Sequence, residues 1–230
     1  MNQIYSEDYK KFLSRIGEDS IDLICIDPPY EINYTAWDSK ILDWDFLFKS
    51  FYKILKNSGN LIIFNGWSNV TNLININDLF KLENWIIWDR VKGRGAKRNF
   101  TSTREDILWF TKSDDYTFNK EFSNTPKKTK GMGTKNGQLN RSLSNVWIDI
   151  PPLVPWSKEY TGYPTQKPVA LMKRIVRIFS NPDDLVLDCF MGSGSTIEAA
   201  ILENRQYIGC DNNKKAHKIC LERIKKYKSS

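Results

Sequence analysis

Short runs of apolar residues recur along the chain at the length of a β-strand. The runs are nearly continuous rather than alternating between apolar and polar residues, which is typical of parallel strands covered on both faces. Six such runs predict buried strands, and they span Ile21–Ile26, Leu61–Phe64, Trp85–Trp88, Ile107–Phe110, Leu185–Leu187 and Tyr207–Cys210.

Between these runs lie segments in which apolar residues recur every three or four positions, the spacing of a helix with one buried face. They predict six helices: Glu7–Arg15, Trp44–Leu55, Val70–Phe80, Pro168–Phe179, Ser195–Leu202 and Lys214–Tyr227. This alternation of strands and helices favours an α/β fold with a mostly parallel sheet and helices on both faces. We expect one domain over residues 1–230 with one modest insertion, since 230 residues suit such a domain.

Three of the predicted strands end in an aspartate. The residues are Asp27, Asp188 and Asp211, each directly after an apolar run. In open α/β sheets ligands bind outside the carboxyl ends of the strands, so we expect these three carboxylates to surround one pocket.

The segment Asp188–Thr196 carries a strand into a glycine-rich turn and then into a helix. Gly192 and Gly194 allow a tight turn and a close approach of the backbone to a ligand. The turn lacks the lysine of a phosphate-binding loop, and Ile197 stands where a dinucleotide fingerprint has its third glycine. Asp211 follows about twenty residues later, at the place from which an acid accepts hydrogen bonds from ribose hydroxyls. Together these features predict an adenosine-containing ligand without choosing between cofactors.

The segment Asp27-Pro28-Pro29-Tyr30 follows the first predicted strand. Its two prolines remove two backbone donors and fix the chain where the strand stops. A rigid loop with a structural tyrosine explains the prolines. It does not explain a carboxylate at the end of the strand with an aromatic ring beyond the prolines.

These residues resemble the DNA amino-methyltransferases, whose catalytic motif is Asp/Asn/Ser-Pro-Pro-Tyr/Phe/Trp. The turn Asp188–Thr196 resembles the cofactor motif of that family, and Thr165–Ile175 resembles the segment before it. The family usually has histidine where this chain has Tyr163. The catalytic motif comes first, the variable region second and the cofactor motif last, and this order is similar to the beta arrangement of the family. The resemblance covers roughly residues 20–88 and 145–225. It implies a circularly permuted Rossmann-like methyltransferase fold with S-adenosyl-L-methionine as cofactor.

The resemblance also assigns roles to residues. The catalytic residues are Asp27, Pro28, Pro29 and Tyr30, in which the Asp27 carboxylate and the Pro28 carbonyl accept the hydrogens of a base amine and Tyr30 stacks on the flipped base. The family more often has glutamate at the position of Asp211, so its reach to ribose is shorter. Lys167 either pairs with the methionine carboxylate of the cofactor or is a solvated lysine. The implied cofactor-binding residues are Asp27, Lys167, Asp188, Phe190, Gly192, Gly194, Ser195, Thr196 and Asp211.

An exocyclic base amine is a poor nucleophile, whereas a sulfonium methyl group is strongly electrophilic. Methyl transfer therefore needs positioning and hydrogen-bond acceptors rather than a strong base or a metal ion. A cytosine C5 enzyme needs a Pro-Cys nucleophile, and no cysteine in this chain follows a proline. Asp rather than Ser at position 27 favours adenine N6 as the target. N4 of cytosine, an RNA or protein amine, and a catalytically silent nucleic-acid-binding module stay open as alternatives.

The formal net charge is +7, and one stretch accounts for it. Residues 90–141 hold thirteen basic and five acidic residues, a net +8, interleaved with glycine and asparagine. Regular periodicity is also lost between Lys112 and about Trp147, which predicts a loop. We interpret 90–147 as an inserted target-recognition region that contacts double-stranded DNA, with Arg94, Lys97 and Arg98 as the first DNA-binding candidates.

The four cysteines form no Cys-x-x-Cys pair, and three of them lie in apolar runs, which is typical of buried thiols in a reducing compartment rather than of a metal site. No signal peptide and no membrane span are expected, which favours the cytoplasm. The resemblance also implies a homodimer and a partner restriction endonuclease.

Overall fold

The computed structural model describes residues 2–30, 42–94, 98, 100–126 and 140–227. Eight strands of this part of the chain form one sheet. In their order across the sheet they are β1 (Asn2–Tyr5), β10 (Gln206–Cys210), β9 (Leu185–Asp188), β2 (Ile21–Ile26), β3 (Leu55–Asn65), β5 (Ser102–Thr111), β4 (Lys81–Arg94) and β8 (Val146–Trp147).

Strand β5 is antiparallel to both of its neighbours, β3 and β4. The other neighbouring pairs in the sheet are parallel. The carboxyl ends of every strand except β5 therefore lie at one edge of the sheet, and the loops that follow these strands meet there.

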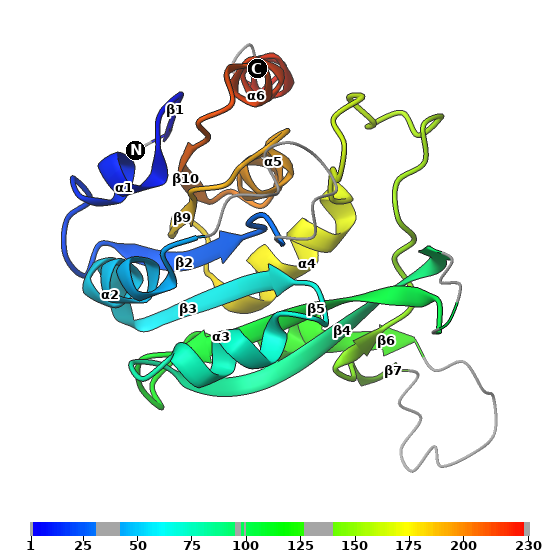
Figure 1. Ribbon diagram of the computed structural model, residues 1–230, viewed down its shortest axis with the longest axis horizontal. Helices are drawn as coiled ribbons and strands as arrows, with labels where there is room; N and C mark the ends of the chain where they lie inside the picture. Colours follow the sequence, from blue (N-terminus) through cyan, green and yellow to red (C-terminus); the bar gives the residue numbers. More distant parts are fainter. Residues whose placement is uncertain (1, 31–41, 95–97, 99, 127–139, 228–230) are drawn as a thin grey trace.

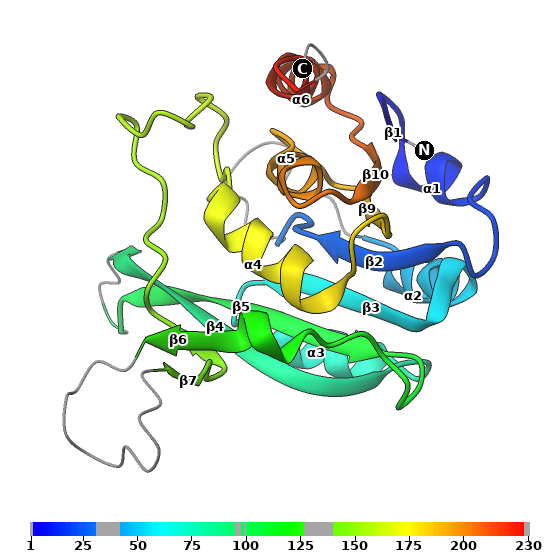
Figure 2. The same cartoon turned by 180° about the vertical axis from the view of Figure 1, so that it is seen from behind.

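Helices cover both faces of the sheet. One face carries α1 (Tyr9–Leu13), α2 (Trp44–Ile54) and α3 (Val70–Ile76), and the other carries α4 (Val169–Phe179), α5 (Ser195–Leu202) and α6 (Lys214–Lys225). In Figure 1, α2 and α3 lie in front of the sheet. In Figure 2, which shows the protein from the opposite side, α4 and α5 lie in front. In β2, Leu23 and Cys25 face α4 and α5, whereas Ile24 and Ile26 pack toward α2. Burial on both faces explains why the strand sequences read as continuous apolar runs.

The predicted α/β fold with a mostly parallel, mixed sheet is confirmed, and all six predicted strands are present. Some element boundaries were wrong. The helix predicted to reach Phe80 ends at Ile76, because the Asn77 side chain bonds both the N–H and the carbonyl of Phe80 and closes a turn. The edge strand β1 was not predicted, since it is short and has no buried residue.

The region 90–147 contains part of the main sheet. Strand β5 lies inside this range and pairs with both β3 and β4, so the range is not an insertion along its whole length. The loop predicted from Lys112 onward also contains ordered elements: a short 3-10 helix (Lys120–Ser123), β6 (Asn124–Pro126), β7 (Asn140–Ser142) and β8. These elements are too short for their periodicity to be recognised. Within the described part of the chain, every helix is too short or too polar to cross a lipid bilayer.

Candidate active site

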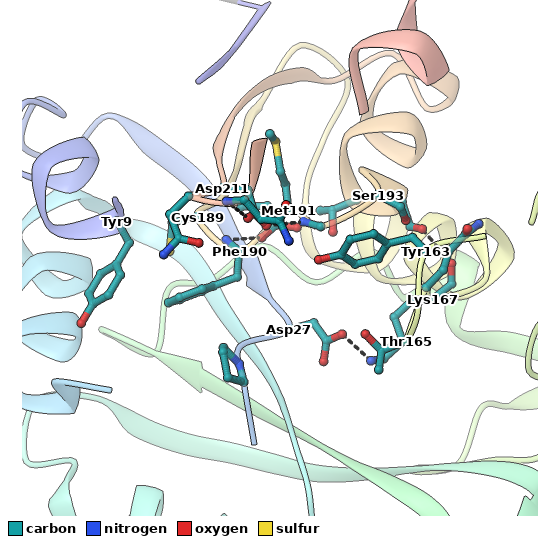
Figure 3. A pocket seen from close by; sticks show the side chains of 18 of the residues that line it. Tyr9, Asp27, Tyr163, Thr165, Lys167, Cys189, Phe190, Met191, Ser193 and Asp211 are labelled. Carbon is teal, nitrogen blue, oxygen red and sulfur yellow. Dashed lines mark hydrogen bonds and ion pairs between the residues drawn. The ribbon is translucent and has the colours of Figure 1, made fainter. Parts of the chain in front are cut away.

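The three strand-end aspartates line one cavity. Asp27 follows β2, Asp188 ends β9 and Asp211 follows β10, and these strands are neighbours in the sheet. Their carboxyl ends bring the three side chains to a cavity of about 340 Å³, in which Figure 3 labels Asp27 and Asp211. The expectation of one shared pocket is confirmed.

The turn between β9 and α5 forms a wall of this cavity. Gly192 and Gly194 have φ angles of +49° and +82°, in the left-handed region that favours glycine. The N–H of Gly192 donates to the Asp211 carboxylate over 2.9 Å, and the N–H of Phe190 donates to the Asp188 carboxylate over 3.0 Å. Two of the three aspartates thus hold the shape of the turn as well as line the cavity.

Tyr163 closes the cavity beside the turn. It is buried, and a methyl group added at Gly192 would lie 3.1 Å from its ring. The glycine therefore makes room for an aromatic ring at the position where the resembling family usually has histidine. On the other side, the ring of Phe190 packs on that of Tyr9 with centroids 5.3 Å apart, which gives the cavity an apolar wall.

The start of α5 is tied to the segment that carries Lys167. The hydroxyl of Ser195 donates to the Lys167 carbonyl over 2.7 Å, and the buried Arg223 guanidinium donates to the Ser195 hydroxyl over 3.0 Å. Ser195 and Thr196 are both buried and both line the cavity. This contact fixes the segment before α4 against the cofactor motif, although the two are far apart in the sequence.

Asp27 is held by two side chains. The Lys167 ammonium forms an ion pair with one carboxylate oxygen (Figure 3), and the Tyr30 hydroxyl donates to the other over 2.6 Å. The Lys167 side chain is only 7% exposed, so the alternative of a solvated lysine was wrong. Pro28 is buried, and Pro29 lines the cavity.

Glu105 and Arg90 belong to this site and were missed from the sequence. Glu105, on β5, pairs with the Lys167 ammonium over 3.1 Å and with Arg90, on β4, over 3.1 Å. The Tyr30 hydroxyl lies 3.5 Å from the same carboxylate. The only sequence signal was an acidic pair, Glu105 and Asp106, before an apolar run, and that signal did not indicate a partner.

Burial raises the pKa of the Asp27 carboxyl, against the opposing effect of the Lys167 ammonium. Burial alone would lower the pKa of Lys167, but Asp27 and Glu105 outweigh it and the pKa is raised, so the amine stays protonated. Burial also raises the pKa of Asp188 to about 7. The site therefore holds the protonated Lys167 ammonium between the Asp27 and Glu105 carboxylates.

The three predicted DNA-binding residues lie within residues 94–98, whereas the segments that line the cavity lie elsewhere in the sequence. Arg98 is exposed beyond the end of β4. Lys97 and the side chain of Arg94 lie outside the described residues. Their contact with DNA stays a prediction.

Comparison with known proteins identifies the family. Residues 21–222 match the family model described as DNA methylase, which covers N6 and N4 methyltransferases. The chain belongs to the DNA methylase family. It is 34% identical to the Type II methyltransferase M1.MboII of Moraxella bovis, over 93% of this chain and 92% of that protein. It is 33% identical to the DNA adenine methyltransferase YhdJ of Escherichia coli strain K12, over 92% of this chain and 79% of that protein.

A solved structure also resembles this DNA methylase. The complex of M1.HpyAVI with S-adenosylmethionine is 27% identical, covers 97% of this chain and all of that one, and superimposes with a TM-score of 0.68. The predicted family, the Rossmann-like methyltransferase fold and the enzyme class are confirmed, and so is S-adenosylmethionine as the cofactor.

The cavity of the methylase fits S-adenosylmethionine chemically. It combines carboxylates that accept hydrogen bonds from ribose hydroxyls and an ammonium group with an apolar wall suited to an adenine ring or a thioether. Both oxygens of Asp211 already accept backbone N–H groups, from Gly192 and Asn213. A carboxylate oxygen has two lone pairs, so Asp211 keeps the capacity to accept from ribose. The assignment of individual residues to the cofactor stays a prediction.

Proposed function

We propose that this protein transfers a methyl group from S-adenosylmethionine to the N6 amine of adenine within a short specific sequence of duplex DNA, as the modification enzyme of a restriction-modification system. The observation that carries the proposal is the position of Asp27, at the end of β2 and in the lining of the cofactor-sized cavity. The similarity to M1.MboII and to the DNA adenine methyltransferase YhdJ supports the reaction and the target base.

The residues of the chain act on the target amine by accepting its hydrogens. The lone pair of this amine is delocalised into the base, so acceptors that draw the hydrogens out of the base plane make the nitrogen more nucleophilic. The Asp27 carboxylate and the Pro28 carbonyl are the two acceptors. S-adenosylmethionine, when bound, supplies the electrophilic methyl group. The 22% of the Asp27 side chain that stays exposed is the surface that an amine can reach.

Tyr30 follows the acceptors and presents an aromatic ring beside them. Its hydroxyl donates to Asp27, which fixes the orientation of both side chains. A flipped base stacks on this ring with its amine toward Asp27. A catalytically silent module has no use for this arrangement, and the intact pair of Asp27 and Tyr30 therefore favours an enzyme over a binding module.

Duplex DNA reaches this edge of the sheet through the basic region. The hairpin formed by β4 and β5 ends at the same edge as Asp27, and a two-stranded ribbon fits the major groove. Arg98 is exposed there. The net charge of +8 over residues 90–141 supplies the attraction to phosphates. Sequence choice falls to Arg94 and its neighbours within the proposed target-recognition region 90–147.

Expression in a host that lacks DNA methylation, followed by long-read mapping of modified bases, tests the function. We expect N6-methyladenine at one short sequence across the host genome. The Asp27→Ala variant is the matched control, and it should leave the genome unmodified. N4-methylcytosine in place of N6-methyladenine would overturn the target base, and an unmodified genome with the wild-type protein would overturn the function.

A homodimer and a partner restriction endonuclease belong to the same proposal, because the family resemblance implies both. Light scattering of the purified protein tests the dimer. Protection of the methylated genome from cleavage by the partner nuclease tests the second part, and a fully cleaved genome would contradict it.

A further inference from the structure

Four charged side chains of alternating sign form a row that ends at Asp27. Arg90 comes from β4, Glu105 from β5, Lys167 from the segment before α4 and Asp27 from the end of β2. Each contacts the next, and their formal charges sum to zero. A neutral row lowers the cost of burying two carboxylates and an ammonium where little water enters.

Lys167 is the shared member of this row. Its ammonium has three hydrogens and pairs with Asp27 and with Glu105, and it lies over the rings of Tyr30 and Phe64 at 5.7 and 5.2 Å from their centroids. Two aromatic rings and two carboxylates thus hold the ammonium in place. Lys167 therefore has little freedom to change partners by moving away.

In the proposed reaction Asp27 must pair with Lys167 and also accept a hydrogen bond from the target amine. A lysine paired with Asp27 alone would concentrate its positive charge on that carboxylate and weaken it as an acceptor for the target amine. A lysine shared with a second carboxylate interacts less strongly with either. Glu105 is that second carboxylate: it lies 3.1 Å from the Lys167 ammonium, and the Tyr30 hydroxyl that bonds Asp27 lies 3.5 Å from it.

We propose that Glu105 is a positioning residue for methyl transfer: it holds the Lys167 ammonium between two carboxylates, so that Asp27 stays aligned yet keeps its strength as an acceptor. Arg90 pairs with Glu105 in turn and holds its carboxylate in place. This inference rests on the proposed function, because it assumes that Asp27 accepts the hydrogens of the target amine.

A purely structural ion pair makes a different prediction. If Glu105 only anchors Arg90 and Lys167, its loss should lower stability and leave the rate of methyl transfer above the acid limb unchanged. If it acts through Lys167 on Asp27, its loss should lower that rate as well as move the acid limb. The titratable or charged groups that face Asp27 within the described residues are Cys25, Tyr30, Glu105, Tyr163, Lys167 and Asp188.

The direction of the change follows from the charges. The negative charge of Glu105 disfavours ionised Asp27 and raises its pKa, whereas the positive charge of Lys167 lowers it. Methyl transfer needs ionised Asp27, so its rate falls as the pH drops through the pKa of Asp27. Glu105→Gln should move this acid limb to lower pH, and Lys167→Gln should move it to higher pH.

The experiment measures methyl transfer to a duplex that contains the methylated sequence. Single-turnover conditions are used because product release then does not limit the rate. The rate is measured from about pH 4 to about pH 9 in steps of about one pH unit. We expect Glu105→Gln to lower the plateau rate about ten- to a hundredfold, as for a group displaced by a fraction of an ångström. Its acid limb should lie at lower pH than in the wild-type protein. Cofactor affinity by calorimetry should stay close to wild type, since Glu105 is not one of the residues that line the cavity.

Asp106→Asn is the matched control. Asp106 is the next residue on β5, fully buried, and bonds the Trp85 indole and Arg104. Its neighbour Glu105 points to the opposite face of the sheet, so the control removes the same charge from the same strand. Its acid limb should coincide with that of the wild type, even where the variant unfolds more easily.

A wild-type rate and acid limb in Glu105→Gln would overturn the inference, and so would a lower rate with an unmoved limb. If Glu105→Gln does not fold, Glu105→Asp is the test, because it keeps the negative charge but draws the carboxylate back from Lys167 by one methylene group. Its acid limb should stay near that of the wild type while its rate falls. An unchanged rate would overturn the inference. Wild-type protein that methylates no DNA would instead refute the proposed function.

Discussion

Replacing Gly194 with alanine tests how closely the cofactor turn is packed against α6. Gly194 has a φ of +82°, and a methyl group at this position would lie 2.3 Å from the sulfur of Cys220 and 3.1 Å from its Cβ. Cys220 is fully buried in α6, so its backbone cannot retreat without moving the helix. The turn and the helix must therefore separate to admit one methyl group.

Two costs add in this variant. The left-handed conformation costs an alanine about 1–2 kcal/mol. Overpacking of a filled interior costs about 1–3 kcal/mol more. We expect the free energy of unfolding to fall by about 2–5 kcal/mol, a large share of the roughly 5–15 kcal/mol typical of a folded domain.

Urea denaturation of two variants separates these costs. Gly162→Ala is the matched control, because Gly162 has a φ of +78° and no atom within 4 Å of the added methyl group. Gly162→Ala should lose only the conformational part, and Gly194→Ala should lose clearly more. Adding Cys220→Ala to Gly194→Ala should recover part of the difference, since it removes the nearest atom. Equal losses in the two glycine variants would refute the packing argument.

Four further predictions concern the site and the basic region. Asp27→Ala should lower the single-turnover rate of methyl transfer about a hundredfold or more with the fold retained, because one of two acceptors disappears; full activity would remove Asp27 from catalysis. Asp211→Ala should weaken S-adenosylmethionine binding in calorimetry and leave DNA affinity mostly intact, and unchanged cofactor affinity would transfer the ribose contact to another residue. Neutralising Lys97 and Arg98 should weaken binding to every duplex and reduce the log–log salt slope by about one unit per lost phosphate contact. Replacing Arg94 should instead relax sequence choice at one position. Unchanged affinity, salt slope and methylated sequence in all these variants would mean that this stretch is only a solvated loop.

The sequence by itself determined the local features of this protein. Continuous apolar runs predicted the central strands, because burial on both faces of a sheet leaves no polar positions within a strand. The end of a strand is also a local property. The positions of Asp27, Asp188 and Asp211 at carboxyl ends therefore followed from the runs before them, and their shared cavity followed from the rule that parallel strands end at one edge.

The resemblance to DNA amino-methyltransferases rested on contiguous motifs, so it too was available from the sequence. The turn with Gly192 and Gly194 and the segment Asp27–Tyr30 each lie within a few residues. Their backbone requirements are local, and a sequence displays them without reference to the rest of the fold.

Only the tertiary structure decided which side chains meet. Lys167 reaches Asp27 across 140 positions of sequence, and Glu105 reaches the same ammonium from an antiparallel strand in the middle of the sheet. No periodicity indicates such a contact, because an ion pair depends on how distant elements pack and leaves no pattern in either segment alone. For the same reason the sequence did not show that β5 lies between β3 and β4, and so did not show that Glu105 pairs with Lys167.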